Sequence, residues 1–554
     1  MTEQVEEVQV LVVGGGPVGL ATAIELGRRS ISTLLIEQVE EGAEKFPTAN
    51  NVGIRTMEHL RRWGLAEEVR RVGPSEYSNR RVYLTAIGGH ELFRFEMPAA
   101  CESAIFPYSP ESFIWCPKMY FDPVLERYAK MLPSVRLRYG TKFTGLEQDE
   151  DGVTATLEST DGATRTVRAQ YVVGCDGAAG TTRRLLGIDW TGVFPDRTST
   201  VVYFRSSALR GHLGVDATQY WIGGNGNAII SIDGNERWRT RVPGGADVQE
   251  HLSKFLGEGT DFEVISTWSM RGSRAMANSY RSGRVFLAGD SAHMHTPYGG
   301  KAANTGMQDG IDLAWKLGAV LQGWGGPHLL DSYQVERRPI ALQLHRFQGL
   351  DLSGAEPRPI PGGGPEVPGL NLDFHGDSAE AKRARIETAD RLREARKDEF
   401  DHPGLELGFR YEGSPIIWPD ESPAPPEEIT SYTQTSRPGA RAPHGWLKAG
   451  VSTLDTLGDG FTLMRFGPST LDTSSFESAA VRRGVPLTLA DFDQPHLREL
   501  YGGVRMALVR PDGMVAWRGD VLPRPDELLD RVCGFEAPSA ARTSKQATSA
   551  GMRA

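Results

Sequence analysis

Residues 8–37 constrain the fold more than any other part of the chain. The apolar run 8–13 is typical of a strand that is buried on both faces of a parallel sheet, and it leads into a turn with the pattern GxGxxG. A helix rich in Ala and Leu and a second short strand at 33–36 follow, and an acid, Glu37, comes directly after that strand. This order of strand, glycine turn, helix, strand and acid predicts a nucleotide-binding βαβ unit.

Each residue of this unit has a physical reason to be where it is. Gly14 permits the tight turn, Gly16 lets a pyrophosphate approach the backbone, and Gly19 lets the helix pack closely on the sheet. Glu37 can accept hydrogen bonds from ribose hydroxyls, and an acid here disfavours the 2′-phosphate of NADP, so we expect the adenine end of NAD or FAD. The predicted binding residues are Gly14, Gly16, Pro17, Gly19, Glu37 and Gln38.

A second segment, 284–321, predicts the other end of the same cofactor. A short apolar strand runs into Gly289 and Asp290, and a glycine-containing loop then leads into a long amphipathic helix that starts near Asn304. Backbone N–H groups at such a helix start can face an anion, and the carboxylate of Asp290 can accept from sugar hydroxyls. We therefore assign the flavin end of FAD to this segment. The predicted residues are Gly289, Asp290, Pro297, Gly300, Lys301, Ala302, Ala303 and Asn304.

The length and texture of the chain predict several domains. A chain of 554 residues exceeds one ordinary domain. Residues 188–274 are rich in Thr, Val, Tyr and Trp, which favours an antiparallel sheet. The predicted division is a discontinuous FAD-binding domain at 1–80, 110–187 and 275–350; a substrate-binding sheet at 81–109 and 188–274; a helical and Pro-rich linker at 351–438; a third domain at 439–536; and a disordered tail at 537–554.

Composition excludes several classes of partner. Asp and Glu (71) outnumber Lys and Arg (61), which argues against nucleic acid. No apolar run reaches the ~18 residues that a membrane span needs, and the polar N-terminus is not a secretory signal. The four cysteines form no CxxC pair and no metal-like spacing, so we expect reduced thiols, a cytoplasmic location and no metal site.

Three motifs in fixed order carry a resemblance to a known family. GGGPVG at 14–19, CDG at 175–177 and GDSAHMHTPYGGKAANTGMQD at 289–309 together resemble the class A FAD-dependent aromatic hydroxylases, which have the p-hydroxybenzoate hydroxylase fold. Segments 439–447, 452–467 and 508–518 are similar to the thioredoxin-like third domain of the phenol hydroxylase and chlorophenol monooxygenase branch. That domain lacks CxxC here, so packing or contacts in a homo-oligomer are its expected use.

The resemblance implies a cofactor, co-substrates and further site residues. FAD would be reduced by NADPH or NADH and would pass one oxygen atom of O2, through a flavin C4a-hydroperoxide, to a phenolic or other electron-rich aromatic small molecule, polyketide-like compounds included. Asp176 would lie near the pyrophosphate, and Tyr298 would lie where the flavin meets the substrate chamber. Of the aromatic residues on the predicted sheet, we expect Tyr220 and Trp221 to face the substrate, with core packing as the alternative for either one.

The chain departs from the family pattern at several positions. Thr48 stands where the family often has an arginine, Lys118 where a glutamine commonly contacts FAD, and Gly180 where a serine is usual. Lys301 follows the double glycine. We hypothesise that Lys118 and Lys301 together offset the charge of the missing arginine.

The sequence names no catalytic base. His293, His295, Tyr220 and Tyr298 are candidates, but the two histidines are expected to be structural because they lie between a strand and a loop beside the cofactor. Much of the catalysis would reside in the flavin. Three alternatives remain: Baeyer–Villiger or epoxidation chemistry on a natural product, a flavin dehydrogenase or oxidase without oxygen transfer, and a non-catalytic FAD-binding protein.

Overall fold

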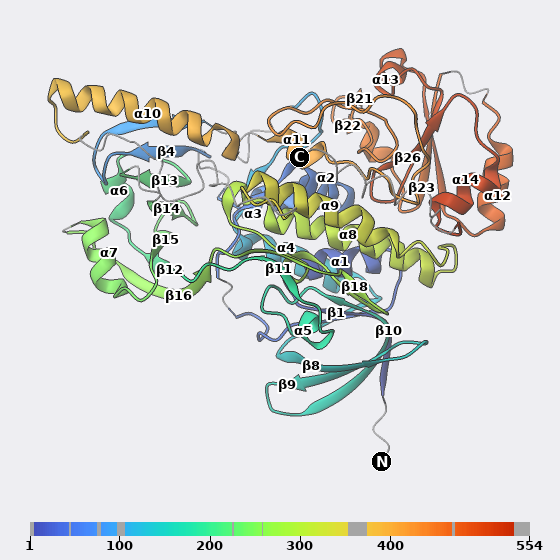
Figure 1. The fold of residues 1–554 in the computed structure, drawn as a ribbon, viewed down its shortest axis with the longest axis horizontal. Helices are drawn as coiled ribbons and strands as arrows, with labels where there is room; N and C mark the ends of the chain where they lie inside the picture. Colours follow the sequence, from blue (N-terminus) through green and yellow to red (C-terminus); the bar gives the residue numbers. More distant parts are fainter. Residues whose placement is uncertain are drawn as a thin grey trace, which may run out of the picture.

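The computed structural model describes residues 5–43, 46–74, 79–96, 106–223, 227–257, 259–352, 374–400, 402–467 and 471–536. The predicted disordered tail at 537–554 lies outside these residues. Figure 1 shows a central body, a separate sheet on the left that carries helix α10, and a C-terminal body at the upper right. The α/β fold class predicted from the sequence is confirmed, whereas the boundaries drawn between domains remain predictions.

The central sheet is built around the first predicted strand. β1 (Glu6–Val13) pairs in parallel with β2 (Thr33–Ile36) on one side and with β10 (Thr164–Gly174) on the other, and the sheet has the order β18-β19-β10-β1-β2-β7. β2 has the predicted bounds, and β1 starts two residues before the predicted one. The carboxyl ends of these parallel strands therefore meet at one edge of the sheet, where α/β proteins bind nucleotides.

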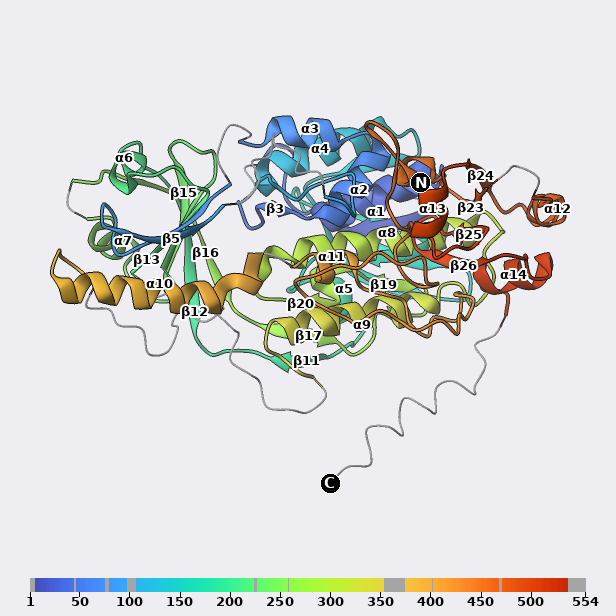
Figure 2. The ribbon, with the colours of Figure 1, turned by 90° about the horizontal axis from the view of Figure 1, so that it is seen from above.

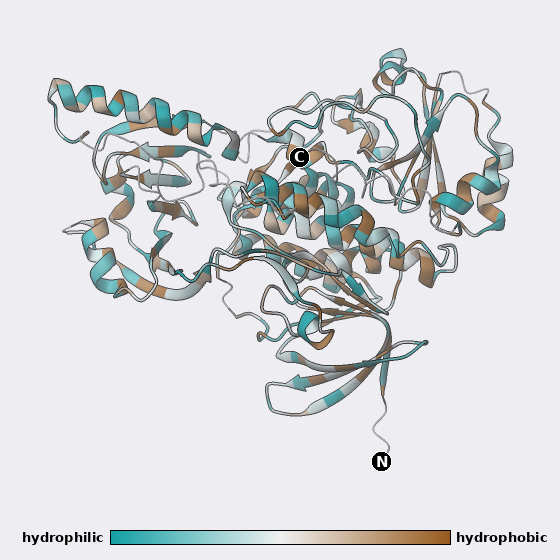
Figure 3. Cartoon of the chain, viewed as in Figure 1, coloured by the Kyte–Doolittle hydropathy of each residue, from teal (hydrophilic) through white to brown (hydrophobic). Residues whose placement is uncertain are grey.

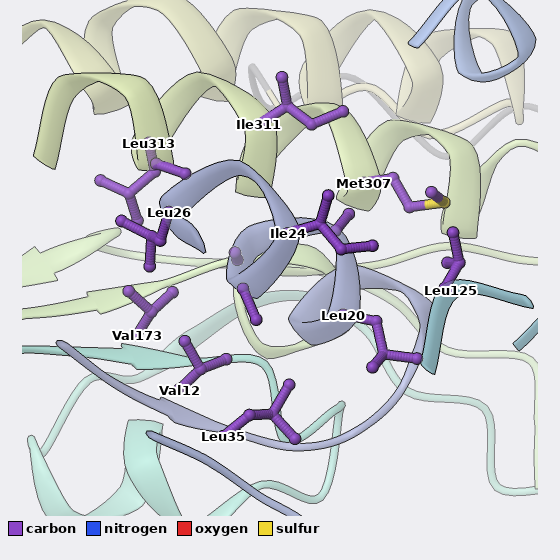
Figure 4. Packing of buried hydrophobic residues seen from close by; sticks show 14 of the residues in the cluster. Val12, Leu20, Ile24, Leu26, Leu35, Leu125, Val173, Met307, Ile311 and Leu313 are labelled. Atoms are coloured by element: carbon purple, nitrogen blue, oxygen red, sulfur yellow. The ribbon is translucent and has the colours of Figure 1, made fainter. Parts of the chain in front are cut away.

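Helices cover this sheet and bury the apolar residues that the βαβ pattern predicted. α1 (Pro17–Arg28) packs against α8 (Ala302–Leu321) and α4 (Lys118–Met131). Figure 4 shows Leu20 and Ile24 of α1 between Val12 of the sheet and Met307 of α8, and all four are buried. Burial of such a side chain contributes about 1.5–3 kcal/mol. The long helix expected near Asn304 begins at Ala302.

A seven-stranded sheet forms the second body, in the order β16-β12-β15-β14-β13-β4-β5. Its pairs are antiparallel except for β13 with β4, which is parallel. Helices α6 (Leu209–Leu213) and α7 (Val248–Leu256) supply leucines to the apolar core on one face of the sheet. The strands are β4 (Arg81–Leu84), β5 (Glu91–Phe95), β12 (Thr198–Arg205), β13 (Gln219–Ile222), β14 (Asn227–Ser231), β15 (Arg237–Pro243) and β16 (Glu263–Arg271).

The charged helix α10 (Ala379–Phe400) is more than a solvated segment. Its outer face is exposed, as its charge alternation predicts, but Ala389 and Leu392 are buried against Phe93 and Tyr83 of the seven-stranded sheet. Figure 3 shows the mixed colours that result, with hydrophilic turns interrupted by hydrophobic ones. A few apolar residues therefore suffice to attach this highly charged helix to the sheet.

The C-terminal body contains a four-stranded mixed sheet in the order β24-β23-β25-β26. β23 (Phe461–Phe466) and β25 (Met506–Val509) are its central strands, and β24 (Leu487–Phe492) and β26 (Val515–Gly519) flank them. Trp315 of α8 and Trp324 pack against Phe461, so this body is joined to the cofactor-binding helices by an apolar contact. The view from above in Figure 2 shows the C-terminal body beside α8 and α9 (Ser332–Phe347).

The remaining elements complete these bodies or connect them. They are β3 (Asn51–Val52), α2 (Ile54–Trp63), α3 (Ala66–Val72), β6 (Ile114–Trp115), β7 (Val135–Arg138), β8 (Thr141–Gln148), β9 (Val153–Ser159), α5 (Thr181–Leu185), β11 (Trp190–Val193), β17 (Arg274–Ala277), β18 (Arg281–Ser282), β19 (Val285–Leu287), η1 (Gly289–Ser291), β20 (His293–Met294), η2 (Tyr298–Gly300), α11 (Pro403–Leu407), β21 (Trp446–Lys448), β22 (Val451–Ser452), η3 (Thr453–Thr456), α12 (Ser474–Arg482), α13 (Pro495–Leu500) and α14 (Pro525–Val532). None of the helices among the described residues has the length and apolar character that crossing a bilayer requires.

Candidate active site

The glycine turn after β1 has the geometry that the motif predicts. Gly14 has φ +110°, a conformation that side chains rarely adopt, and a Cβ there would overlap the carbonyl oxygen of Cys175. Its N–H donates to the carbonyl oxygen of Ile36 at 2.8 Å, which ties the turn to β2. A Cβ built on Gly16 meets nothing within 4 Å, so the space in front of this turn is open.

Gly19 makes the turn and helix α1 pack closely, and its replacement should weaken cofactor binding. A Cβ at this position would overlap the carbonyl oxygen of Gly14, so Gly19→Ala must push α1 away from the turn. Such overpacking costs about 1–3 kcal/mol, and we expect the affinity for FAD to fall roughly tenfold. Titration of the stripped protein with FAD measures this. Gly211→Ala, where a Cβ meets open space, is the matched control, and equal affinities for the two variants would contradict the expectation.

Glu37 and Gln38 follow β2 at the same edge of the sheet. One carboxylate oxygen of Glu37 accepts from the N–H of Gly15 at 2.7 Å, and the other accepts from the N–H of Val39 at 3.0 Å. The carboxylate thus holds the glycine turn in place, and its predicted contact with ribose hydroxyls remains a prediction. Gln38 is exposed beside it.

Asp176 links two of the three sequence motifs. Its carboxylate accepts from the N–H and the hydroxyl of Thr182 at 2.8 and 2.9 Å, and from the hydroxyl of Ser291 at 2.9 Å. The CDG and GDS segments are therefore fixed to each other at the carboxyl ends of β10 and β19. Asp290, next to Ser291, has an exposed side chain that can accept hydrogen bonds from a ligand.

Residues 296–301, which we call the glycine loop, lead into α8 and are held by two buried amides. Asn304 accepts from the N–H of Gly53 at 2.7 Å and donates to the carbonyl oxygen of Gly300 at 3.0 Å. Gln348 donates to the carbonyl oxygens of Thr296 and Tyr298 and accepts from the N–H of Thr296. Of the predicted residues, Pro297 and Gly300 belong to this loop, and Ala302 and Ala303 begin α8. Gly299 and Gly300 have φ values of +74° and +66°.

The two lysines that depart from the family pattern are both paired with carboxylates. Lys118 contacts Asp122 one turn along α4, and Lys301 contacts Glu406 of α11. Lys301 is buried, and desolvation, which outweighs the attraction of Glu406, lowers its pKa. Because a carboxylate already compensates each charge, neither lysine adds an uncompensated cation to the site. That the two lysines offset the missing arginine when FAD is bound stays a hypothesis.

Within residues 289–295, His293 is buried and His295 is half-buried among protein groups. His293 shares a 2.6 Å hydrogen bond with Asp309, whose carboxylate also accepts from the N–H of Gly289 at 3.1 Å. The ring of His295 lies 4.9 Å from that of His293 and 4.2 Å from that of His345, and burial holds its pKa well below the ordinary value. Asp309 thus supports both Gly289 and His293 from α8.

The seven-stranded sheet separates Tyr220 from Trp221. The hydroxyl of Tyr220 donates to the carbonyl oxygen of Val215 at 2.7 Å, and the ring is 1% exposed in the core beneath α6 and α7. Core packing, the alternative weighed for Tyr220, is therefore its role. Trp221 lies on the opposite face, stacked 5.9 Å from the ring of Tyr83. Tyr298, a residue of the glycine loop, packs against Phe347 and Leu344.

Three buried residues beside the predicted site were not among the predicted site residues. Asp309, Gln348 and Glu406 hold backbone N–H groups of Gly289, Thr296 and Ile54, respectively. Asp309 and Gln348 lie on α8 and just after α9, where the sequence shows ordinary helical polarity. Glu406 lies in the segment that was assigned to a linker, and nothing near it in the chain indicates contact with α2 or Lys301.

The described residues fit FAD. Among them no side chain caps α1 or α8, and neither helix has an acid in its first turn, so two helix N-termini offer N–H groups and positive partial charge to anionic groups. The turn with open space at Gly16 suits a pyrophosphate, and the exposed carboxylate of Asp290 suits a polyol. His, Cys, Asp and Glu form no cluster in the described part of the chain that could hold a metal ion.

Comparison with known proteins agrees with this arrangement. Residues 7–348 match the FAD binding domain family, and residues 435–535 match the family of aromatic-ring hydroxylase C-terminal domains. The chain is 31% identical to 4-methyl-5-nitrocatechol 5-monooxygenase of Burkholderia sp over 94% of this chain and 96% of that protein. It is 30% identical to tetracenomycin A2 monooxygenase-dioxygenase of Streptomyces glaucescens over 94% of each.

A solved structure gives the same result over the whole fold. Chromopyrrolic acid-soaked RebC with bound 7-carboxy-K252c superposes with a TM-score of 0.85 at 34% identity, covering 96% of this chain and all of that one. Because the match covers 96% of this chain, it includes the FAD-binding body, the seven-stranded sheet and the C-terminal body. The chain belongs to the FAD-dependent aromatic-ring hydroxylases, a family of flavoprotein monooxygenases.

Proposed function

We propose that this protein hydroxylates a phenolic or other electron-rich aromatic small molecule, polyketide-like compounds included, at the expense of O2 and NADPH or NADH. The observation that carries the proposal is the position of α10. Its inner face packs on β5, beside the aromatic residues of the sheet, and the same helix lies against η2 of the glycine loop. An aromatic surface and the loop that leads into α8 are thus held together by one element.

The residues around the glycine loop have defined tasks in such a reaction. Bound FAD supplies the redox chemistry that connects a reduced nicotinamide and O2 to oxygen transfer. The N-terminus of α8 stabilises negative charge on the ligand in front of it, and the amides of Asn304 and Gln348 keep its approach fixed. Asp290 orients hydroxyl groups of the bound cofactor.

Exclusion of water is the second task of the site. The stacked rings of Trp221, Tyr83 and Phe93 form an apolar cluster beneath α10, with 4.3 Å between the centroids of the buried rings Tyr83 and Phe93. An apolar enclosure protects oxygen transfer from competing hydrolysis and holds a planar ring by stacking. No described side chain needs to act as a catalytic base for this proposal, and we name none.

Product analysis under labelled O2 tests the proposed function. A panel of phenols and polycyclic phenols is incubated with the FAD-loaded protein and each nicotinamide, and NADPH or NADH oxidation is followed. We expect at least one substrate to accelerate oxidation and to give a phenolic product with one labelled oxygen atom. A labelled lactone or epoxide would instead show Baeyer–Villiger or epoxidation chemistry. Stoichiometric H2O2 without a labelled product would show an oxidase.

A further inference from the structure

Helix α11 belongs to the segment that was assigned to the linker, yet it packs on α2 of the cofactor-binding body. Glu406 of α11 is buried there, and one of its carboxylate oxygens accepts from the N–H of Ile54 at 2.6 Å. A Cβ built on Gly53 would lie 2.6 Å from the same oxygen. The carboxylate of Glu406 is therefore fixed at the start of α2 and has little room to move.

The other carboxylate oxygen of Glu406 contacts the ammonium group of Lys301. Both side chains are 8% exposed, so the ion pair is almost completely buried. Lys301 ends the glycine loop and is the N-cap residue of α8. Its charge thus lies within one side-chain length of the N–H groups at the start of this helix, where the flavin end of FAD is predicted.

The surroundings of Lys301 offer no second carboxylate. A cavity of about 20 Å³ borders the ion pair, and Glu406 is the only acid among the described residues that line it. The other cation of the lining, Arg55, already pairs with Glu58 at 2.8 Å. His402 of the preceding turn also faces Lys301, but burial and this cation hold its pKa well below the ordinary value, so the ring is neutral near pH 7.

The charge of Lys301 depends on Glu406. Desolvation lowers the pKa of Lys301, Glu406 raises it by its charge and by its hydrogen bond, and Arg81 of β4 lowers it. Loss of the carboxylate would leave a buried ammonium group without its counterion, which is unfavourable. The pKa of Lys301 would then fall further, and the ammonium would lose its proton at a lower pH than in the wild type.

The charge at the start of α8 matters because the cofactor changes its own charge in the reaction. Two electrons and one proton convert oxidised FAD to a reduced form with one additional negative charge. An uncompensated cation nearby favours this reduced form, whereas a neutral ion pair favours it much less. A cofactor that is less stabilised in its reduced form has a larger driving force for electron transfer to O2.

We propose that Glu406 is a positioning residue for the FAD reaction, which fixes Lys301 at the end of the glycine loop, cancels its charge and thereby limits the stabilisation of reduced FAD. This inference rests on the proposed function and deepens it, because it assigns a residue that regulates the cofactor of that same site. Glu406 acts on FAD through Lys301. A part of the segment assigned to the linker therefore belongs to the redox site.

The equilibrium between oxidised and reduced FAD, measured in the FAD-loaded protein against a reference dye without substrate or O2, tests the proposal. Glu406→Gln removes the charge and keeps an acceptor for the N–H of Ile54. At about pH 6.5 we expect Glu406→Gln to favour reduced FAD roughly tenfold more than the wild type does, a shift of about 30 mV. The shift should shrink as the pH rises and Lys301 loses its proton.

Two further variants separate the charge of Lys301 from loss of structure. The double variant Glu406→Gln/Lys301→Met removes both charges and should return the equilibrium to within about twofold of the wild type. Glu250→Gln is the matched control, because Glu250 pairs with Lys254 at 2.6 Å on the exposed surface of α7 and should also stay within about twofold.

Lys301→Met alone keeps the proposal testable if Glu406→Gln does not retain FAD. It leaves Glu406 without its cation and should shift the equilibrium towards oxidised FAD. The proposal is overturned if Glu406→Gln or, in its place, Lys301→Met behaves like the wild type, or if the double variant keeps the whole shift of Glu406→Gln. A labelled phenolic product together with an equilibrium that ignores Glu406 would leave the proposed function standing while the role of Glu406 fails.

Discussion

Asp309→Ala should lower the free energy of unfolding by about 3–5 kcal/mol and should release FAD from the protein, which is one of the two largest effects that we expect of a single substitution. The carboxylate is completely buried and accepts from Arg337 at 2.7 Å, from His293 at 2.6 Å and from the N–H of Gly289 at 3.1 Å. Its removal leaves a buried guanidinium without its counterion and a backbone donor without its acceptor.

The electrostatics of Asp309 make the direction of this effect clear. Burial alone would raise the pKa of the carboxyl, but His293 and Arg337 outweigh it and hold the pKa below the ordinary value. A depressed pKa in the folded state means that the ionised form stabilises the fold at neutral pH, and that this contribution is lost as the pH falls. Gly289 directly precedes Asp290, which is predicted to contact FAD. Loss of the Asp309 carboxylate should therefore disturb the cofactor site as well as the core.

Denaturant unfolding and the fraction of FAD retained after gel filtration measure both consequences. Asp261→Ala removes an exposed carboxylate and should change the unfolding free energy by less than about 0.5 kcal/mol. Asp309→Asn keeps the shape of the side chain and should lie between the wild type and Asp309→Ala. An Asp309→Ala protein that unfolds like the wild type and keeps its FAD would show that the buried network tolerates an unpaired Arg337.

The cofactor half of the site could be predicted because its signals are local. The bounds of β2 and the turn at Gly14, with φ +110°, follow from a few adjacent residues. The end of α2 at Gly64, which has a left-handed conformation, is equally local. A glycine turn between a buried strand and a helix has few structural solutions, so residues 8–37 specify their conformation without help from the rest of the chain.

The substrate half of the site depends on pairing between distant segments. Tyr220 and Trp221 are adjacent in sequence, and only the register of β13 with β4 and β14 decides which ring meets the core and which meets the opposite face of the sheet. A shift of one residue would exchange them, because successive side chains of a strand point to opposite faces. The ion pair of Lys301 with Glu406 spans 105 residues, which no spacing rule indicates.

Arg510→Met should destabilise the protein by about 3–5 kcal/mol, although Arg510 lies in the C-terminal body and not in the cofactor-binding one. Its guanidinium is fully buried and donates to both carboxylate oxygens of Glu336 on α9, at 2.6 and 2.9 Å, and to Asp312 on α8 at 3.0 Å. Asp512 accepts from the same guanidinium, and Lys316 supplies the other cation of the cluster.

The loss of stability in Arg510→Met should become larger as the pH rises. Burial would raise the pKa of Glu336, but the attraction of Arg510 and Lys316 outweighs burial and lowers this pKa to about 2. For Asp312, burial outweighs the attraction of Lys316 and raises the pKa to about 7. Without Arg510 both carboxyls lose attraction and both pKa values rise, so the folded variant holds protons that the unfolded chain releases. Since stability falls with rising pH wherever the folded state binds more protons, the difference from the wild type should grow as the pH rises above about 2, where wild-type Glu336 ionises, and again above about 7, where wild-type Asp312 does.

Unfolding by denaturant at several pH values measures this difference, and FAD retention shows whether it reaches α8. Arg482→Met is the matched control, because Arg482 is exposed and 3.6 Å from Asp526, and surface pairs of this kind contribute about 0–1 kcal/mol at any pH. A pH-independent loss would mean that packing of the arginine stem, rather than its charge, joins the two bodies. A full loss of FAD at pH 8 and its retention at pH 5 would show that the C-terminal body stabilises the cofactor site through Glu336 and Asp312.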